Sequence, residues 1–103
     1  MPSLQVQIGR VTDRSFPGWV ECSFQDADGK TQSFEEKIPV VSNGKPMDDA
    51  ALPVCGHVDC ERQAVWTDDR GRNLARIDID RPWGVQSTTG QTQFVVLACQ
   101  LSE

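Results

Sequence analysis

The chain has 103 residues, of which 24% are charged and 38% hydrophobic, and its formal net charge is −5. A chain of this length is predicted to fold as one domain, and its composition is typical of a globular rather than a disordered protein. The excess of acidic residues argues against nucleic acid and anionic membrane surfaces as partners, and favours a basic protein.

The first half of the chain is predicted to form three strands. Residues 4–11 alternate apolar and polar side chains, as a half-buried strand does, and residues 19–25 repeat the pattern. Residues 26–29, Asp-Ala-Asp-Gly, predict a hairpin turn that leads into a third strand over 31–38. A proline, which lacks the N–H that a strand donates, then begins an irregular segment over 39–53.

The second half is predicted to add further short strands. Residues 54–66 form a long strand that is expected to bend near Gly56, and residues 74–80 alternate clearly. A short extra strand is expected over 85–87, and a last strand over 92–101. With no helical period of useful length, this pattern predicts an all-β fold.

The last strand contains six consecutive apolar residues, Phe94 to Cys99. Because they do not alternate with polar residues, both faces of this strand are expected to be covered, which predicts a central strand. We therefore expect a single β-domain over residues 1–103, a small antiparallel barrel of six or seven strands or a strongly curved sheet. The residues expected in its core include Val20, Phe24, Ile77, Ile79, Val96 and Leu97.

Two cysteines and a histidine lie within one six-residue segment, as Cys55, His57 and Cys60. Thiolates and imidazoles are the ligands that zinc prefers, and Cys22 or Cys99 could supply a fourth. However, alternation along a strand puts Cys60 on the face opposite Cys55 and His57. We therefore predict no metal and no other cofactor, with a zinc site at these three residues as the alternative.

No set of residues predicts catalysis. His57 is the only histidine, and on a strand its side chain would lie parallel to that of Cys55, with no third group to orient it. Asp78 and Asp80 share one strand face with Arg76, which is the pattern of a solvated surface. The protein is therefore expected not to be an enzyme.

Two turns and one loop are candidates for binding. Trp19 and Trp83 each follow a proline closely in a Pro/Gly turn, and the segment 39–53 carries Asp48 and Asp49, with a short helical turn expected at 48–52. The main hypothesis is an interaction module, such as an acidic inhibitor or immunity-type partner of a basic protein. A binder of small molecules or carbohydrates that uses the two tryptophans is a further alternative.

Four segments of the chain resemble small uncharacterised bacterial proteins of about this length: FPGWVE (16–21), DADGK (26–30), DIDRPWGVQST (78–88) and FVVLACQL (94–101). The resemblance implies a bacterial, soluble, stand-alone domain and brings no activity with it. Since no basic stretch followed by an apolar one begins the chain, and no segment is long enough for a membrane span, we expect a cytoplasmic protein with four reduced cysteines.

Overall fold

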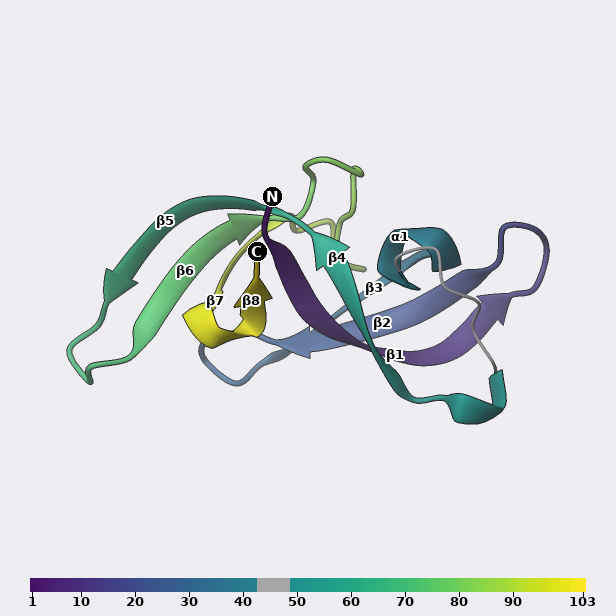
Figure 1. Cartoon of the computed structure of the whole chain (residues 1–103), viewed down its shortest axis with the longest axis horizontal. Helices are drawn as coiled ribbons and strands as arrows, with labels where there is room; N and C mark the ends of the chain where they lie inside the picture. Colours follow the sequence, from purple (N-terminus) through teal and green to yellow (C-terminus); the bar gives the residue numbers. More distant parts are fainter. Residues whose placement is uncertain (43–48) are drawn as a thin grey trace.

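Two antiparallel sheets make up most of the molecule (Figure 1). The structure is a computed structural model and describes residues 1–42 and 49–103. The predicted all-β class is confirmed, and within these residues one short α-helix and two short 3-10 helices lie beside the strands.

The larger sheet has five strands. Their order is β3-β2-β1-β4, and β8 pairs with the beginning of β1. The strands are β1 (Ser3–Asp13), β2 (Trp19–Gln25), β3 (Thr31–Lys37), β4 (Val54–Asp59) and β8 (Leu101–Ser102). Burial alternates along β1 as far as Ile8, and along β2, as their apolar-polar patterns predict. It also alternates along β3, where the buried positions include the polar Gln32 and Glu36, so one face of this sheet lies on the core and the other faces solvent.

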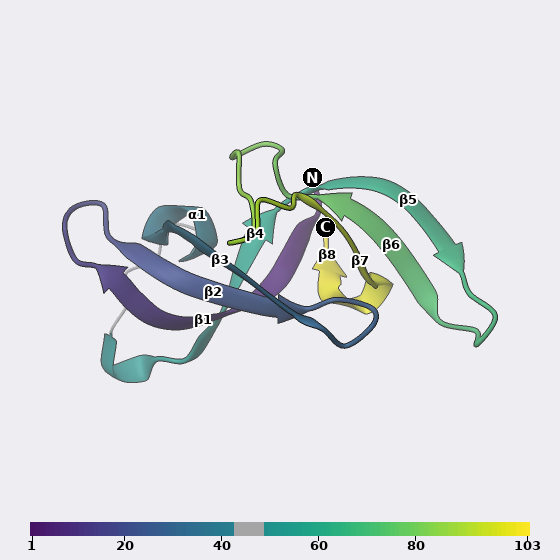
Figure 2. The ribbon, with the colours of Figure 1, turned by 180° about the vertical axis from the view of Figure 1, so that it is seen from behind.

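The smaller sheet has three strands in the order β5-β6-β7. They are β5 (Glu61–Thr67), β6 (Asn73–Asp78) and β7 (Gln93–Leu97). The β5–β6 hairpin extends away from the larger sheet, and both views show it as an arm at one end of the elongated molecule (Figures 1 and 2).

The chain passes from one sheet to the other at Cys60. The predicted single strand over 54–66 is thus divided into β4 and β5, and the interruption lies four residues after the bend that was expected near Gly56. Cys60 is fully buried, and its N–H donates to the carbonyl of Pro2. Gly56 instead continues β4, where the lack of a side chain leaves space for Ile8 and for the backbone of Val41.

Three short helices connect the strands. β3 ends at Lys37, and the chain enters α1 (Ile38–Ser42) directly. Pro39 occupies the first turn of this helix, where its missing N–H leaves no intrahelical hydrogen bond unmade. The other two are η1 (Asp49–Ala51), within the expected helical turn, and η2 (Ala98–Gln100).

One core cluster contains side chains from both sheets and from α1. Phe24 of β2 and Phe94 of β7 meet edge to face, with ring centroids 5.1 Å apart. A backbone hydrogen bond from Ala27 to Val95 also connects the β2–β3 turn to β7. The buried apolar residues include Leu4, Val6, Ile8, Val20, Cys22, Phe34, Val41, Val58, Cys60, Ile77, Ile79 and Val96.

Several expectations about the strands are wrong. The described strands form two open sheets, so the predicted barrel is not found. β7 lies at an edge of its sheet, with β6 in the middle, and burial alternates from Phe94 to Leu97, which leaves Leu97 half-buried. The expected last strand over 92–101 is interrupted, because β7 ends at Leu97 and η2 begins at Ala98, and residues 85–87 form no strand. The other five expected core residues are buried.

Candidate functional site

The structure places Trp19 and Trp83 at opposite ends of β1. Trp19 is the first residue of β2 and pairs with Asp13, and the ammonium group of Lys37 lies 5.0 Å from the centroid of its ring. Trp83 is 55% exposed, and its indole N–H donates to the carboxylate of Asp59 at 3.2 Å. Asp59 pairs with Ser3, ten residues from Asp13 along β1. The two tryptophans therefore do not form one site.

The acidic residues proposed for binding lie outside what the structure describes. Asp48 belongs to the segment 43–48, and although the backbone of Asp49 begins η1, its side chain is not described. Binding through Asp48 and Asp49 stays a prediction.

Cys55, His57 and Cys60 differ sharply in exposure. Cys55 is exposed and His57 is half-buried on the outer face of β4, whereas Cys60 is fully buried. The side-chain amide of Gln5 donates to Sγ of Cys55 at 3.4 Å. Over residues 1–42 and 49–103, no three His, Cys, Asp or Glu side chains are grouped so as to hold a metal ion.

The four thiols fall into two accessible and two inaccessible ones. Burial raises the pKa of the Cys22 thiol to about 12, with nearby Glu36 and Glu21 adding to the effect, and burial raises the pKa of the Cys60 thiol to about 11. A buried neutral thiol is a poor nucleophile, which leaves Cys55 and Cys99 as the reactive pair.

We expect two thiols to react quickly with a thiol reagent at pH 8 and two to react only after unfolding. The measurement is the absorbance released by Ellman's reagent, with and without denaturant. Cys55→Ser should remove one fast equivalent, and Cys22→Ser, as the matched control, should remove one slow equivalent. Three or four fast equivalents in the native protein would contradict the burial of Cys22 and Cys60.

Of the two carboxylates considered for catalysis, that of Asp78 makes a structural contact. Asp78 ends β6, and its carboxylate accepts the N–H of Asp80 at 2.9 Å in the turn that follows. Such a contact is typical of a turn-forming aspartate.

A free strand edge carries the largest exposed apolar side chains of the smaller sheet. β5 pairs only with β6 among the described strands, and Val65 and Trp66 on it are 64% and 39% exposed. Sequence reasoning missed this site because it weighed only the tryptophans in turns. The available signal was that Val65 and Trp66 are adjacent in a strand, so that one of them must lie on each face.

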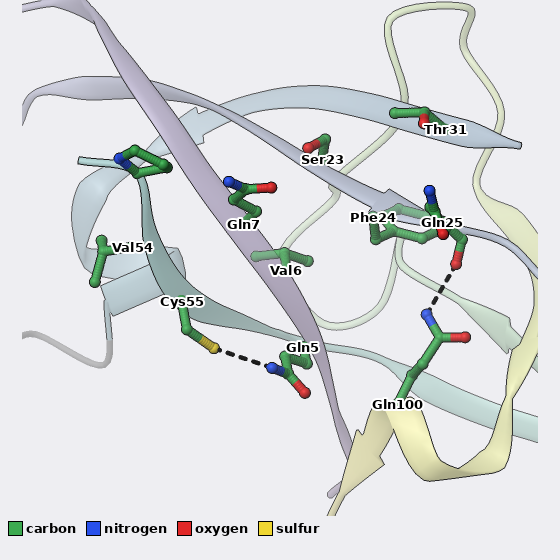
Figure 3. Close-up of a pocket in the computed structure, with 11 residues that line it drawn as sticks. Gln5, Val6, Gln7, Ser23, Phe24, Gln25, Thr31, Val54, Cys55 and Gln100 are labelled. Atoms are coloured by element: carbon green, nitrogen blue, oxygen red, sulfur yellow. Dashed lines mark hydrogen bonds between the residues drawn. The ribbon is translucent and has the colours of Figure 1, made fainter. Parts of the chain in front are cut away.

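The larger sheet has a hollow of about 630 Å³ on its outer face (Figure 3). Its lining contains no charged residue. It is formed by Gln5, Val6, Gln7, Ser23, Phe24, Gln25, Thr31, Pro53, Val54, Cys55 and Gln100. Sequence reasoning could place these polar residues on strands but could not bring them together, because that depends on which strands pair and in what register.

Among the helices described, none has both the length and the apolar character needed to cross a membrane. Comparison of the chain with protein-family models, curated proteins and solved structures finds no match. The resemblance to small bacterial proteins therefore stays a prediction.

Proposed function

We propose that this protein is a binding module that recognises a protein partner by pairing an extended segment of that partner with the free edge of β5. The observation that carries the proposal is that β5 is the end strand of its sheet in the described chain and is exposed on both faces. An unpaired strand edge presents backbone N–H and C=O groups that another chain can satisfy.

The hairpin geometry indicates which backbone groups face outward. The N–H of Asp68 donates to the carbonyl of Arg72, which closes the β5–β6 turn. Inward and outward groups alternate along an antiparallel strand, so Val65 and Thr67 direct their N–H and C=O groups toward the free edge. A bulge between Arg62 and Ala64 interrupts the first half of β5, which leaves residues 64–67 as the segment suited to pairing.

The side chains on this segment support the same proposal. Val65 and Trp66 are neighbours and therefore project from opposite faces of β5. A strand added at the edge would meet an exposed apolar side chain on each of its faces, and tryptophan is among the residues most often found at interface hot spots.

The charge of the chain supports a basic partner. Residues 1–60 carry nine Asp and Glu against five Lys and Arg, whereas residues 61–103 carry six against five. The acidic excess of residues 1–60 would attract a basic partner at long range and raise its association rate with the molecule. An inhibitor or immunity-type role, with Asp48 and Asp49 contributing, is the hypothesis in this class, and its cytoplasmic setting is supported by four cysteines that are all free thiols.

Val65→Lys is expected to abolish partner binding while leaving the fold intact. A lysine on an edge strand places a hydrated charge where the partner strand must pack. The measurement is quantitative mass spectrometry of proteins captured from a bacterial lysate by the immobilised wild-type and variant chains. Proteins enriched by wild type should fall at least tenfold with Val65→Lys.

The matched control is Phe16→Lys, since Phe16 is 99% exposed in the turn between β1 and β2. This variant also replaces an exposed apolar side chain with lysine, and it should retain the captured proteins. Equal capture by wild type and Val65→Lys would exclude the β5 edge. Sedimentation of wild type at rising concentration would show whether a second copy of the chain is the partner.

A further inference from the structure

The hollow on the outer face of the larger sheet is lined by uncharged polar side chains, although about a quarter of all residues in the chain are charged. Its polar side chains from the strands are Gln5, Gln7, Ser23, Gln25, Thr31 and Cys55. Apolar groups border it at Pro53 and at Val54, which is exposed. This face is independent of the β5 edge, because it lies on the other sheet.

The strand register puts Gln7 at the centre of this surface. Gln7 pairs with Ser23 of β2 on one side and with Cys55 of β4 on the other. Gln5 lies on the same face two residues earlier in β1, and Gln25 pairs with Thr31 of β3. Figure 3 shows these side chains, which come from β1, β2, β3 and β4, around the hollow.

The lack of charge determines the class of ligand. An anion bound here would find no cationic side chain in the lining, and a cation would find no carboxylate. Removing an unpaired charge from water is costly, so either would bind poorly. Arg10 and Glu21, which lie on the same face outside the lining, form an ion pair with each other at 3.2 Å. The surface therefore selects a neutral ligand.

The hydrogen-bonding groups determine its chemistry. A carboxamide offers both a donor and an acceptor, as a hydroxyl group does, so glutamine can make paired hydrogen bonds with two adjacent hydroxyls. Within the described part of the chain, the side chains of Gln7 and Gln25 have no hydrogen-bond partner, which leaves them available to a ligand.

Two other amides in the hollow are held in place. The amide of Gln5 donates to Cys55. Gln100 accepts the N–H of Leu97 and donates to the carbonyl of Gln25, both at 2.8 Å. Part of the wall is thereby oriented before a ligand arrives, which reduces the entropy lost on binding.

We propose that this hollow binds a neutral oligosaccharide. Its hydroxyls would exchange hydrogen bonds with Gln7, Gln25, Ser23 and Thr31, and an apolar C–H face would rest against Pro53. A peptide is less well suited, since the backbone of an extended peptide is recognised at a sheet edge and this hollow lies over the middle of a sheet, where β1 and β2 are paired on both sides.

The test is a nuclear magnetic resonance titration of the ¹⁵N-labelled full chain. The probes are cellotetraose, maltotetraose, xylotetraose and chitotetraose, with tetragalacturonate as the charged comparison and a Gln/Ser/Thr-rich heptapeptide as the peptide comparison. At least one neutral tetrasaccharide should shift the side-chain amide signals of Gln5, Gln7 and Gln25. Tetragalacturonate and the peptide should shift them at least tenfold less at equal concentration.

Gln7→Glu should weaken that binding at least tenfold, because it places a carboxylate without a cation at the centre of the hollow. Gln63→Glu is the matched control: Gln63 is an exposed glutamine at the bulge of β5, and its replacement should leave the affinity unchanged. The proposal is overturned if no neutral tetrasaccharide shifts these signals, if tetragalacturonate or the peptide binds as well, or if the two variants weaken binding equally.

Discussion

Phe34→Ala is expected to lower the free energy of unfolding by about 3–5 kcal/mol. Phe34 lies in the middle of β3, pairs with Cys22 of β2 and has no exposed surface. Its truncation removes a whole aromatic ring from the core cluster and leaves a cavity that the surrounding strands cannot fully fill. Urea denaturation followed by circular dichroism measures the change.

Phe16→Ala is the matched control for this experiment, since the same atoms are removed from a side chain that is 99% exposed. Phe16→Ala should change the free energy of unfolding by no more than about 0.5 kcal/mol, as is usual for surface substitutions. A loss below about 1 kcal/mol for Phe34→Ala would mean that β3 does not belong to the stabilising core. Similar losses for both variants would show that the exposure of the two phenylalanines is assigned wrongly.

The sequence predicts the strands well where one face of a sheet is buried. β2 begins and ends at the residues expected, because Val20, Cys22 and Phe24 face the core and the residues between them face solvent. A period of two in hydrophobicity follows directly from the backbone of a strand and needs no knowledge of its neighbours. The same reasoning places Ile77 and Ile79 in the core.

The position of a strand within its sheet is not contained in such a pattern. The apolar run from Phe94 to Cys99 led to the expectation of a central strand, but β7 is an edge strand. One edge of β7 pairs with β6, and the carbonyl of Val95 accepts the N–H of Ala27 from the β2–β3 turn. The apolar run is thus covered partly by the β2–β3 turn, which is distant in sequence, so no local pattern in the run reveals that contact.

The division into two sheets has a similar explanation. Residues 54–66 are continuous in β character, and nothing in their composition marks Cys60 as the point where one sheet gives way to the other. The structure shows why the break falls there: Cys60 is buried, and its N–H bonds with Pro2 near the beginning of the chain. A closed barrel was inferred from the need to protect edges, whereas here β5 remains an open edge.

The positions of the candidate sites depend even more on which strands pair and in what register. Gln7, Ser23 and Cys55 are far apart in the sequence and unremarkable individually, and only the register of β1 with β2 and β4 makes them neighbours. The tryptophans were easier to find but harder to interpret. Trp19 is engaged by Lys37 and Trp83 by Asp59, so each has a partner within the chain, while the less prominent Trp66 stands on the free edge.

Gly56→Ala is expected to destabilise the protein by about 1–3 kcal/mol, as overpacking a filled core does. A Cβ atom at Gly56 would lie 2.6 Å from Cδ1 of Ile8 and 2.7 Å from the backbone oxygen of Val41. The end of the Ile8 side chain can move to some extent, but the oxygen belongs to α1, so the helix itself must shift relative to β4. Thermal denaturation of the purified variant measures the loss.

Gly9→Ala is the matched control for this second prediction, because it makes the same change within the neighbouring strand β1. The nearest heavy atom to a Cβ at Gly9 is the carbonyl oxygen of Glu21 at 3.7 Å, an ordinary contact, so stability should hardly change. Adding Ile8→Val to Gly56→Ala removes Cδ1 and should recover only part of the loss, because the backbone oxygen of Val41 at 2.7 Å and a γ carbon of residue 8, at 2.9 Å in the isoleucine, stay close to the new Cβ. Full recovery of stability in the double variant would show that the Ile8 side chain alone restricts the space at Gly56. Equal losses of stability for Gly56→Ala and Gly9→Ala would contradict the packing of α1 against β4.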